Sequence, residues 1–147
     1  MEKTTFKATI NAPREKVWEV LWGDNSYPQW TAPFAEGSKV ETNWEKGSKV
    51  LFLDSKSNSG MVARIADKVP NEFMSFQHLG EVYNGVEDLT SDKVKAWAGA
   101  YENYTLTNVN GKTELLVEMD LADEFKDYFN KAWPLALDKV KELSEQQ

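Results

Sequence analysis

The strongest constraint on the fold is a change of hydrophobic period after Leu121. Beyond this residue the apolar side chains recur at spacings of three and four, which is the period of one face of an α-helix. Before it, much of the chain alternates polar and apolar residues, the period of half-buried strands. The apolar stripe on the predicted helix consists of Phe125, Phe129, Ala132, Trp133, Ala136, Val140 and Leu143. Because an apolar helix stripe and an apolar sheet face bury each other, an α+β fold is predicted.

The terminal helix is predicted from about residue 122 to the C-terminus, with Pro134 inside it. Proline removes one helical hydrogen bond and crowds the preceding turn. We therefore expect a kink or a split in this helix near Asn130.

Seven strands are predicted from the alternating segments, with Asn110-Gly111 as a strong hairpin signal between the last two. Two short helices are expected between the first and second strands, one after Pro13 and one at residues 26–30. The predicted strands are residues 5–10, 38–44, 49–53, 61–66, 73–79, 100–109 and 112–120. The chain of 147 residues is expected to form a single domain, residues 1–147, in which a curved antiparallel sheet wraps around the terminal helix and leaves a pocket beside it.

Composition excludes several function classes. There are 17 Lys and Arg against 24 Asp and Glu, a net charge of −7, so nucleic acid and anionic membrane surfaces are not expected as partners. No apolar run resembles a signal peptide or a membrane span, and we expect a cytoplasmic protein. The chain has no cysteine and one histidine, so neither a metal site nor a cofactor is predicted.

Several stretches carry a family resemblance. Residues 10–21 (INAPREKVWEVL) and 27–30 (YPQW) resemble the entry segments of the START-like, or SRPBCC, superfamily, which has the helix-grip fold. Residues 76–80 (FQHLG) and 97–104 (WAGAYENY) are similar to small bacterial members of its branch named after activators of the heat-shock-protein-90 ATPase. The resemblance implies the fold, whereas members of this superfamily include binders, lipid carriers, enzymes and co-chaperone modules.

Two polar residues are predicted on the apolar, concave face of the sheet. His78 shares its strand face with Phe76, and Glu102 shares its face with Tyr104. Each has a functional interpretation, as a ligand anchor or an acid–base group, and a structural one, as half of an inter-strand pair. Both interpretations stay open at this point.

The predicted cavity lies between the terminal helix and the concave face, with a volume of roughly 300–1,000 Å³ if it is a ligand site. We expect residues 81–97 to form an insertion with a short helix at 92–97, capped by Ser91, and Trp97 to close one end of the cavity. The candidate ligand-binding residues are Phe52, Met61, Phe76, His78, Trp97, Glu102, Tyr104, Val117, Met119, Phe129 and Trp133.

Three functions are compatible with these features. The preferred hypothesis is the binding of a small hydrophobic or amphipathic molecule, because aromatic residues are abundant and no catalytic signature is present. The second is a protein-interaction module, in which the acidic surface meets a basic partner. The third is an enzyme of the cyclase or hydrolase kind that uses Glu102 or His78. Neither the ligand nor the oligomeric state follows from the sequence.

Overall fold

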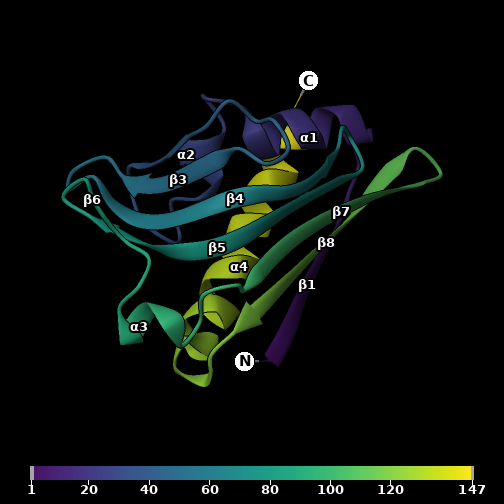
Figure 1. The fold of residues 1–147 in the computed structure, drawn as a ribbon. Coiled ribbons are helices and arrows are strands. Elements are labelled where there is room, and N and C mark those ends of the chain that lie inside the picture. Colours follow the sequence, from purple (N-terminus) through teal and green to yellow (C-terminus); the bar gives the residue numbers. More distant parts are fainter. Residues whose placement is uncertain (1, 147) are drawn as a thin grey trace.

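The computed structural model describes residues 2–146 and shows a curved antiparallel sheet that wraps around one long helix (Figure 1). This is the predicted α+β architecture, including the two short helices between the first and second strands. In chain order the elements are β1 (Glu2–Ile10), α1 (Arg14–Trp22), α2 (Tyr27–Trp30), β2 (Ser38–Glu41), β3 (Lys49–Asp54), β4 (Ser59–Val69), β5 (Phe73–Tyr83), β6 (Val86–Asp88), α3 (Asp92–Lys95), β7 (Tyr101–Val109), β8 (Lys112–Leu121) and α4 (Asp123–Glu145).

The seven predicted strands form one continuous path in the order β1-β8-β7-β5-β4-β3-β2. Every pairing along this path is antiparallel. The first strand lies beside the last, with Ile10 opposite Thr113 and Glu2 opposite Leu121. The sheet therefore joins the first strand to the last, although β1 and β8 are far apart in sequence.

The start of the insertion was not predicted as a strand. Instead of ending at Leu79, β5 continues to Tyr83 and turns back into the short strand β6, which pairs with β5 alone. The turn residues Asn84 and Gly85 have φ of 49° and 82°. Gly80 interrupts the apolar alternation here, and a Cβ at that position would lie 2.3 Å from the carbonyl oxygen of Asp88. The close approach of β6 to β5 thus requires a glycine at position 80, and the same glycine interrupts the apolar alternation that would have predicted the strand.

The second predicted strand is shorter than expected. It ends at Glu41, and Trp44 has a φ of 64°, outside any strand conformation. The Trp44 ring packs against the Trp22 ring, with their centroids 5.5 Å apart. By contrast, the Asn110-Gly111 turn is confirmed, with φ of 54° and 85° at the two residues.

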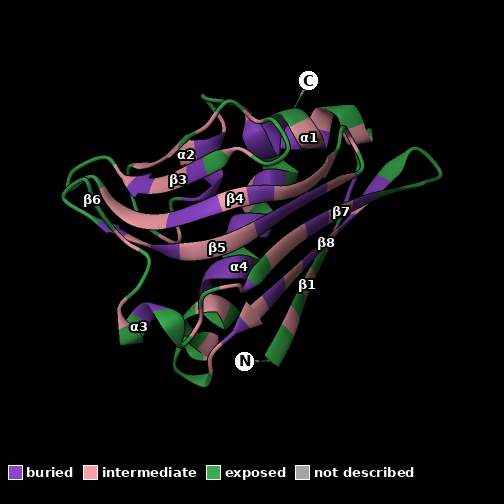
Figure 2. Cartoon of the chain, in the orientation of Figure 1, coloured by how far each residue is buried: buried purple, intermediate pink, exposed green. Residues whose placement is uncertain are grey.

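The helix α4 lies against the concave face of the sheet, and its stripe supplies the centre of the core (Figure 2). Trp133 is 2% exposed, stacks on Phe6 with a centroid distance of 5.7 Å, and donates its Nε1–H to the sulfur of Met119 at 3.0 Å. Farther along the stripe, Ala136 and Val140 are fully buried. This half of the helix is therefore filled by side chains.

Two details of the helix prediction are wrong. First, α4 runs from Asp123 to Glu145 as one helix, so a split at Pro134 is wrong, whereas the alternative of a kink stays a prediction. Both Pro134 and Asn130 are exposed, so water can satisfy the Asn130 carbonyl that proline deprives of its donor. Second, Phe125 is 44% exposed rather than part of the core, because it lies at the mouth of the cavity described below.

The convex side of the sheet also buries some apolar side chains. Leu53, Val62 and Val82 are buried and form a small second cluster, with Leu51 packed against it. These residues come from β3, β4 and β5, which are neighbours in the sheet. The added packing lies at the part of the sheet that also carries β6.

Replacing Trp133 by alanine is expected to destabilise the protein by about 3–5 kcal/mol, because the ring is buried at the contact between helix and sheet. The matched control is Leu135→Ala on the same helix, where the side chain is 60% exposed and the expected cost is under about 0.5 kcal/mol. Urea denaturation measures both. Equal midpoints for the two variants would contradict the described packing of α4.

Candidate ligand-binding cavity

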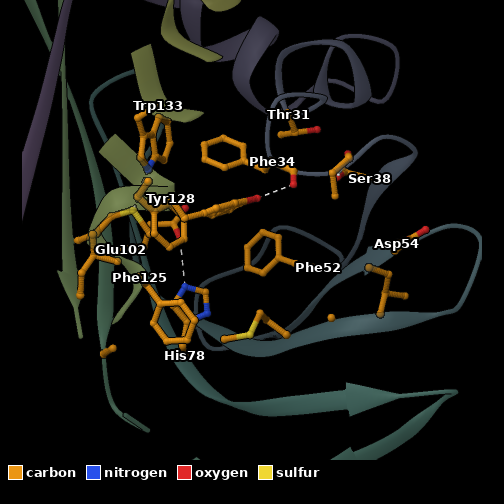
Figure 3. Close-up of a pocket in the computed structure, with 18 of the residues that line it drawn as sticks. Thr31, Phe34, Ser38, Phe52, Asp54, His78, Glu102, Phe125, Tyr128 and Trp133 are labelled. Carbon is orange, nitrogen blue, oxygen red and sulfur yellow. Dashed lines mark hydrogen bonds and ion pairs between the residues drawn. The ribbon is translucent and has the colours of Figure 1, made fainter. Parts of the chain in front are cut away.

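A cavity of about 530 Å³ lies between the concave face of the sheet and the N-terminal half of α4 (Figure 3). Its walls come from the α1–α2 region, from strands β2, β3, β4, β5, β7 and β8, from the segment after α3, and from α4. The volume is within the range that small-molecule sites commonly have. The wall is mostly apolar, with a few polar side chains inside it.

Nine of the eleven candidate residues line this cavity. They are Phe52, Met61, His78, Trp97, Glu102, Tyr104, Met119, Phe129 and Trp133. The prediction was wrong for Phe76 and Val117, which are fully buried behind the wall. Phe76 has the correct strand parity, but the rings of Phe52 and Trp22 cover it, with centroids 5.1 and 5.4 Å away. Parity assigns a side chain to a face without showing what covers it.

The part of the wall formed by the α1–α2 region was missed from the sequence. It consists of Trp22, Tyr27, Trp30, Thr31 and Phe34. Strand alternation gives no information on these positions, and their aromatic character was the only available signal. Phe34 packs edge-on against Trp133 at a centroid distance of 4.9 Å.

A hydrogen bond closes one side of the cavity between this region and α4. The Tyr128 hydroxyl donates to the Phe34 carbonyl oxygen, as Figure 3 shows. Both residues line the cavity, and their rings also meet edge-on. The contact joins segments that are 94 residues apart in the sequence and holds this side of the wall in place.

The polar centre of the cavity is the carboxylate of Glu102, which has a partner at each oxygen. His78 Nε2 lies 3.0 Å from Oε1, and the Tyr104 hydroxyl donates to Oε2. Figure 3 shows the His78 and Glu102 side chains pointing toward each other. The two side chains are only 12% and 14% exposed. We call Glu102, His78 and Tyr104 the Glu102 cluster. Its residues pair between strands and also line the cavity, so both interpretations that the sequence left open apply.

Two buried nitrogen atoms next to the cavity have no hydrogen-bond partner within residues 2–146. They are Nδ1 of His78 and Nε1 of Trp22, both on residues that line the cavity. In the neutral imidazole with its proton on Nε2, Nδ1 is an acceptor. The Trp22 indole is a donor only. Both atoms are buried from solvent, so the residues that line the cavity include one acceptor and one donor that lie behind the wall surface without a partner in the described part of the chain.

Two tyrosines near Glu102 have raised pKa values. Burial raises the pKa of the Tyr104 hydroxyl well above its ordinary value of 10, and the Glu102 charge raises it further. Burial also raises the pKa of Tyr27, with a second contribution from Glu102. Within residues 2–146 the Tyr27 hydroxyl has no hydrogen bond. Tyr27 thus brings a neutral hydroxyl into the electrostatic range of the carboxylate.

The end of the insertion lies at one side of the cavity. The short helix α3 spans Asp92–Lys95, two residues shorter than predicted, and Ser91 caps it by accepting from the Val94 amide at 3.3 Å. Val94 is fully buried and anchors the segment, while Trp97 is half-buried and lines the cavity. The placement at the cavity agrees with the expectation; the closing role of Trp97 stays a prediction.

A metal-binding cluster and a membrane-spanning helix are both absent from the described part of the chain. Within residues 2–146, no group of three or more His, Asp or Glu side chains is placed to hold a metal ion. In the same range, no helix has the length and hydropathy needed to cross a membrane.

The raised tyrosine pKa values predict a loss of stability at high pH. In the unfolded chain each tyrosine ionises near pH 10, whereas both stay protonated in the fold, so the folded chain binds more protons and stability falls as pH rises above that value. Tyr27→Phe removes one contribution, and the loss between about pH 10 and about pH 11 should become smaller by about 1 kcal/mol.

Urea denaturation at several pH values measures this difference. Tyr83→Phe is the matched control, because it removes the same hydroxyl from a ring that is 73% exposed. A pH dependence of Tyr27→Phe identical to that of the parent would contradict the burial of this hydroxyl.

Comparison with known proteins gives a family and a fold. Residues 11–145 match the family described as "Activator of Hsp90 ATPase homolog 1-like protein". No curated protein matches the sequence.

Solved structures with the same fold include three bacterial proteins. The Aha1 dimer from Colwellia psychrerythraea, solved in solution, is 18% identical, with a TM-score of 0.74 and coverage of 99% of this chain and 97% of that one. Protein MLL2253 from Mesorhizobium loti is 18% identical, with a TM-score of 0.71 and coverage of 97% and 96%. CalU16 from Micromonospora echinospora is 14% identical, with a TM-score of 0.66 and coverage of 97% and 76%.

At these identities the likeness establishes the helix-grip fold alone, which is compatible with a ligand-binding or an interaction module. The family match extends over most of the chain, from the segment before α1 to the last turn of α4. The chain therefore belongs to the family of Activator of Hsp90 ATPase homolog 1-like proteins, within the SRPBCC superfamily.

Proposed function

We propose that this protein binds a small, largely apolar molecule in the cavity between α4 and the concave face of the sheet. The observation that carries the proposal is a cavity of about 530 Å³ whose aromatic wall surrounds a carboxylate hydrogen-bonded to His78 and Tyr104. Apolar walls with a few fixed polar groups are typical of small-molecule sites.

The incomplete packing around the cavity also supports ligand binding. A domain core is normally filled to the density of an organic crystal, and large voids next to buried aromatic rings forfeit dispersion contacts. Here Phe52 and Phe129 lie at the cavity wall and are only partly buried. A ligand that restores these contacts supplies a reason for keeping the space open.

A protein-interaction module is the second candidate. One structural neighbour is a dimer, and the β5–β6 hairpin exposes Tyr83 and Val86, at 73% and 70%. An enzyme that uses Glu102 or His78 ranks third, because the sequence carries no catalytic signature around these two residues. Small-molecule binding makes use of more of the described geometry than either alternative.

Titration with the neutral fluorophore N-phenyl-1-naphthylamine tests the proposal. We expect saturable binding with one site per chain, seen as a rise in probe fluorescence on direct excitation. The double variant Ser38→Trp/Met61→Trp places two bulky rings at cavity-lining positions and should weaken binding by about tenfold or more.

The matched control is Tyr83→Trp/Leu135→Trp, which adds the same two rings at exposed positions outside the cavity. Its binding should equal that of the parent, and thermal denaturation checks that both variants are folded. No saturable binding to the parent, or equal binding to the two double variants, would contradict a ligand site in this cavity.

A further inference from the structure

We propose that the molecule held in the cavity carries a cationic nitrogen bound by Glu102, and that amphiphiles with a carboxylate head are excluded. This inference rests on the proposed function and assigns the chemical class of the ligand. It follows from the charge inside the cavity, which the described side chains leave uncompensated.

Glu102 has no lysine or arginine partner among residues 2–146. His78 is its one ion-pair partner in that range, and a histidine is charged only when protonated. The other partner is the Tyr104 hydroxyl, which is a neutral donor. The carboxylate is 14% exposed, so solvent screens it only in part.

The contacts of His78 within residues 2–146 offer a hydrogen-bond acceptor at one ring nitrogen only. Its Nε2 faces Glu102, while Nδ1 is buried without a partner. Protonation would place a second N–H at Nδ1 with no acceptor to receive it, and an unmade hydrogen bond of a buried charged group is costly. The neutral tautomer instead donates from Nε2 to Glu102, and the Glu102 cluster then has a net charge of about −1.

A buried negative charge with neutral donors is stabilised further by a cation. Aromatic rings lie near the carboxylate. Tyr104 donates a hydrogen bond to it, and the Trp22 ring meets the Tyr104 ring edge-on with their centroids 4.9 Å apart. The Phe52 ring lies beside His78, with a centroid distance of 5.9 Å. Aromatic faces attract cations in addition to offering apolar contact. An ammonium group on an apolar tail matches both features of this wall.

Most of the remaining charged residues that line the cavity are acidic. Asp54 and Asp120 make no ion pair within residues 2–146, and each accepts a backbone N–H instead. Glu81 is paired with Lys93 at 3.2 Å. The single lysine in the lining, Lys39, lies 3.2 Å from Glu41, which neutralises it. The local potential therefore attracts cations and repels anions.

Three amphiphiles with the same ten-carbon tail test the inference: decylamine, 1-decanol and decanoate, each displacing N-phenyl-1-naphthylamine at neutral pH. We expect decylamine to bind about tenfold more tightly than 1-decanol, the scale of one charge-assisted hydrogen bond, and decanoate to bind most weakly. In Glu102→Gln the preference for the amine over the alcohol should disappear while the alcohol still binds.

Glu118→Gln is the matched control, because Glu118 is also a glutamate on the sheet but lies outside the cavity lining, 3.5 Å from Lys3. It should keep the preference of the parent. Equal binding of the three amphiphiles, or tightest binding of decanoate, overturns the cationic ligand and leaves the binding function intact. Failure of both the probe and all three amphiphiles to bind overturns the binding function itself. If Glu102→Gln does not fold, the ranking measured on the parent decides.

Discussion

The mutual burial of α4 and the concave face of the sheet determines the rest of this structure. Trp133 is the main contact, since its ring meets side chains from β1, from the α1–α2 region and from β7. Its indole N–H has an acceptor in Met119, so the ring is buried without an unmade hydrogen bond. The apolar stripe of the helix and the apolar face of the sheet are each unstable in water alone, and this contact removes both from solvent.

The cavity follows from the same contact because the two layers touch over only part of their area. Toward its C-terminus α4 presents Ala136 and Val140, which are fully buried. Toward its N-terminus it presents Phe125 and Phe129, which line the cavity. Trp133 lies between these regions, so one half of the helix closes the core and the other half forms a wall.

The sequence predicted what depends on period and on turn chemistry. The helical spacing after Leu121, the strand alternation and the Asn110-Gly111 turn identified the architecture and the concave face, and with it the cavity positions of His78 and Glu102. It did not predict what depends on packing between distant segments. Phe76 has the right parity but lies behind Phe52, and the α1–α2 region joins the wall through Phe34 and Tyr128.

The polar chemistry of the cavity shows the same division. Parity placed Glu102 and Tyr104 on one face of β7, but the hydrogen bond between them and the pairing of Glu102 with His78 depend on how β5 and β7 align. Phe76 lies opposite Glu102 in that alignment, which brings His78 next to the carboxylate. Gly80 interrupts the alternation near the end of β5. The full length of β5 and its pairing with β6 could therefore not be predicted from the sequence.

The most direct test of a ligand between α4 and the concave face is the location of a bound probe. Isotope-filtered nuclear Overhauser measurements on labelled protein with N-phenyl-1-naphthylamine report which side chains lie next to it. We predict contacts from the probe to the ring of Phe52 on the sheet and to the rings of Phe129 and Trp133 on α4, which face each other across the cavity as two of its walls. Contacts confined to exposed residues outside the lining, such as Tyr83, Val86 and Leu135, would contradict the account.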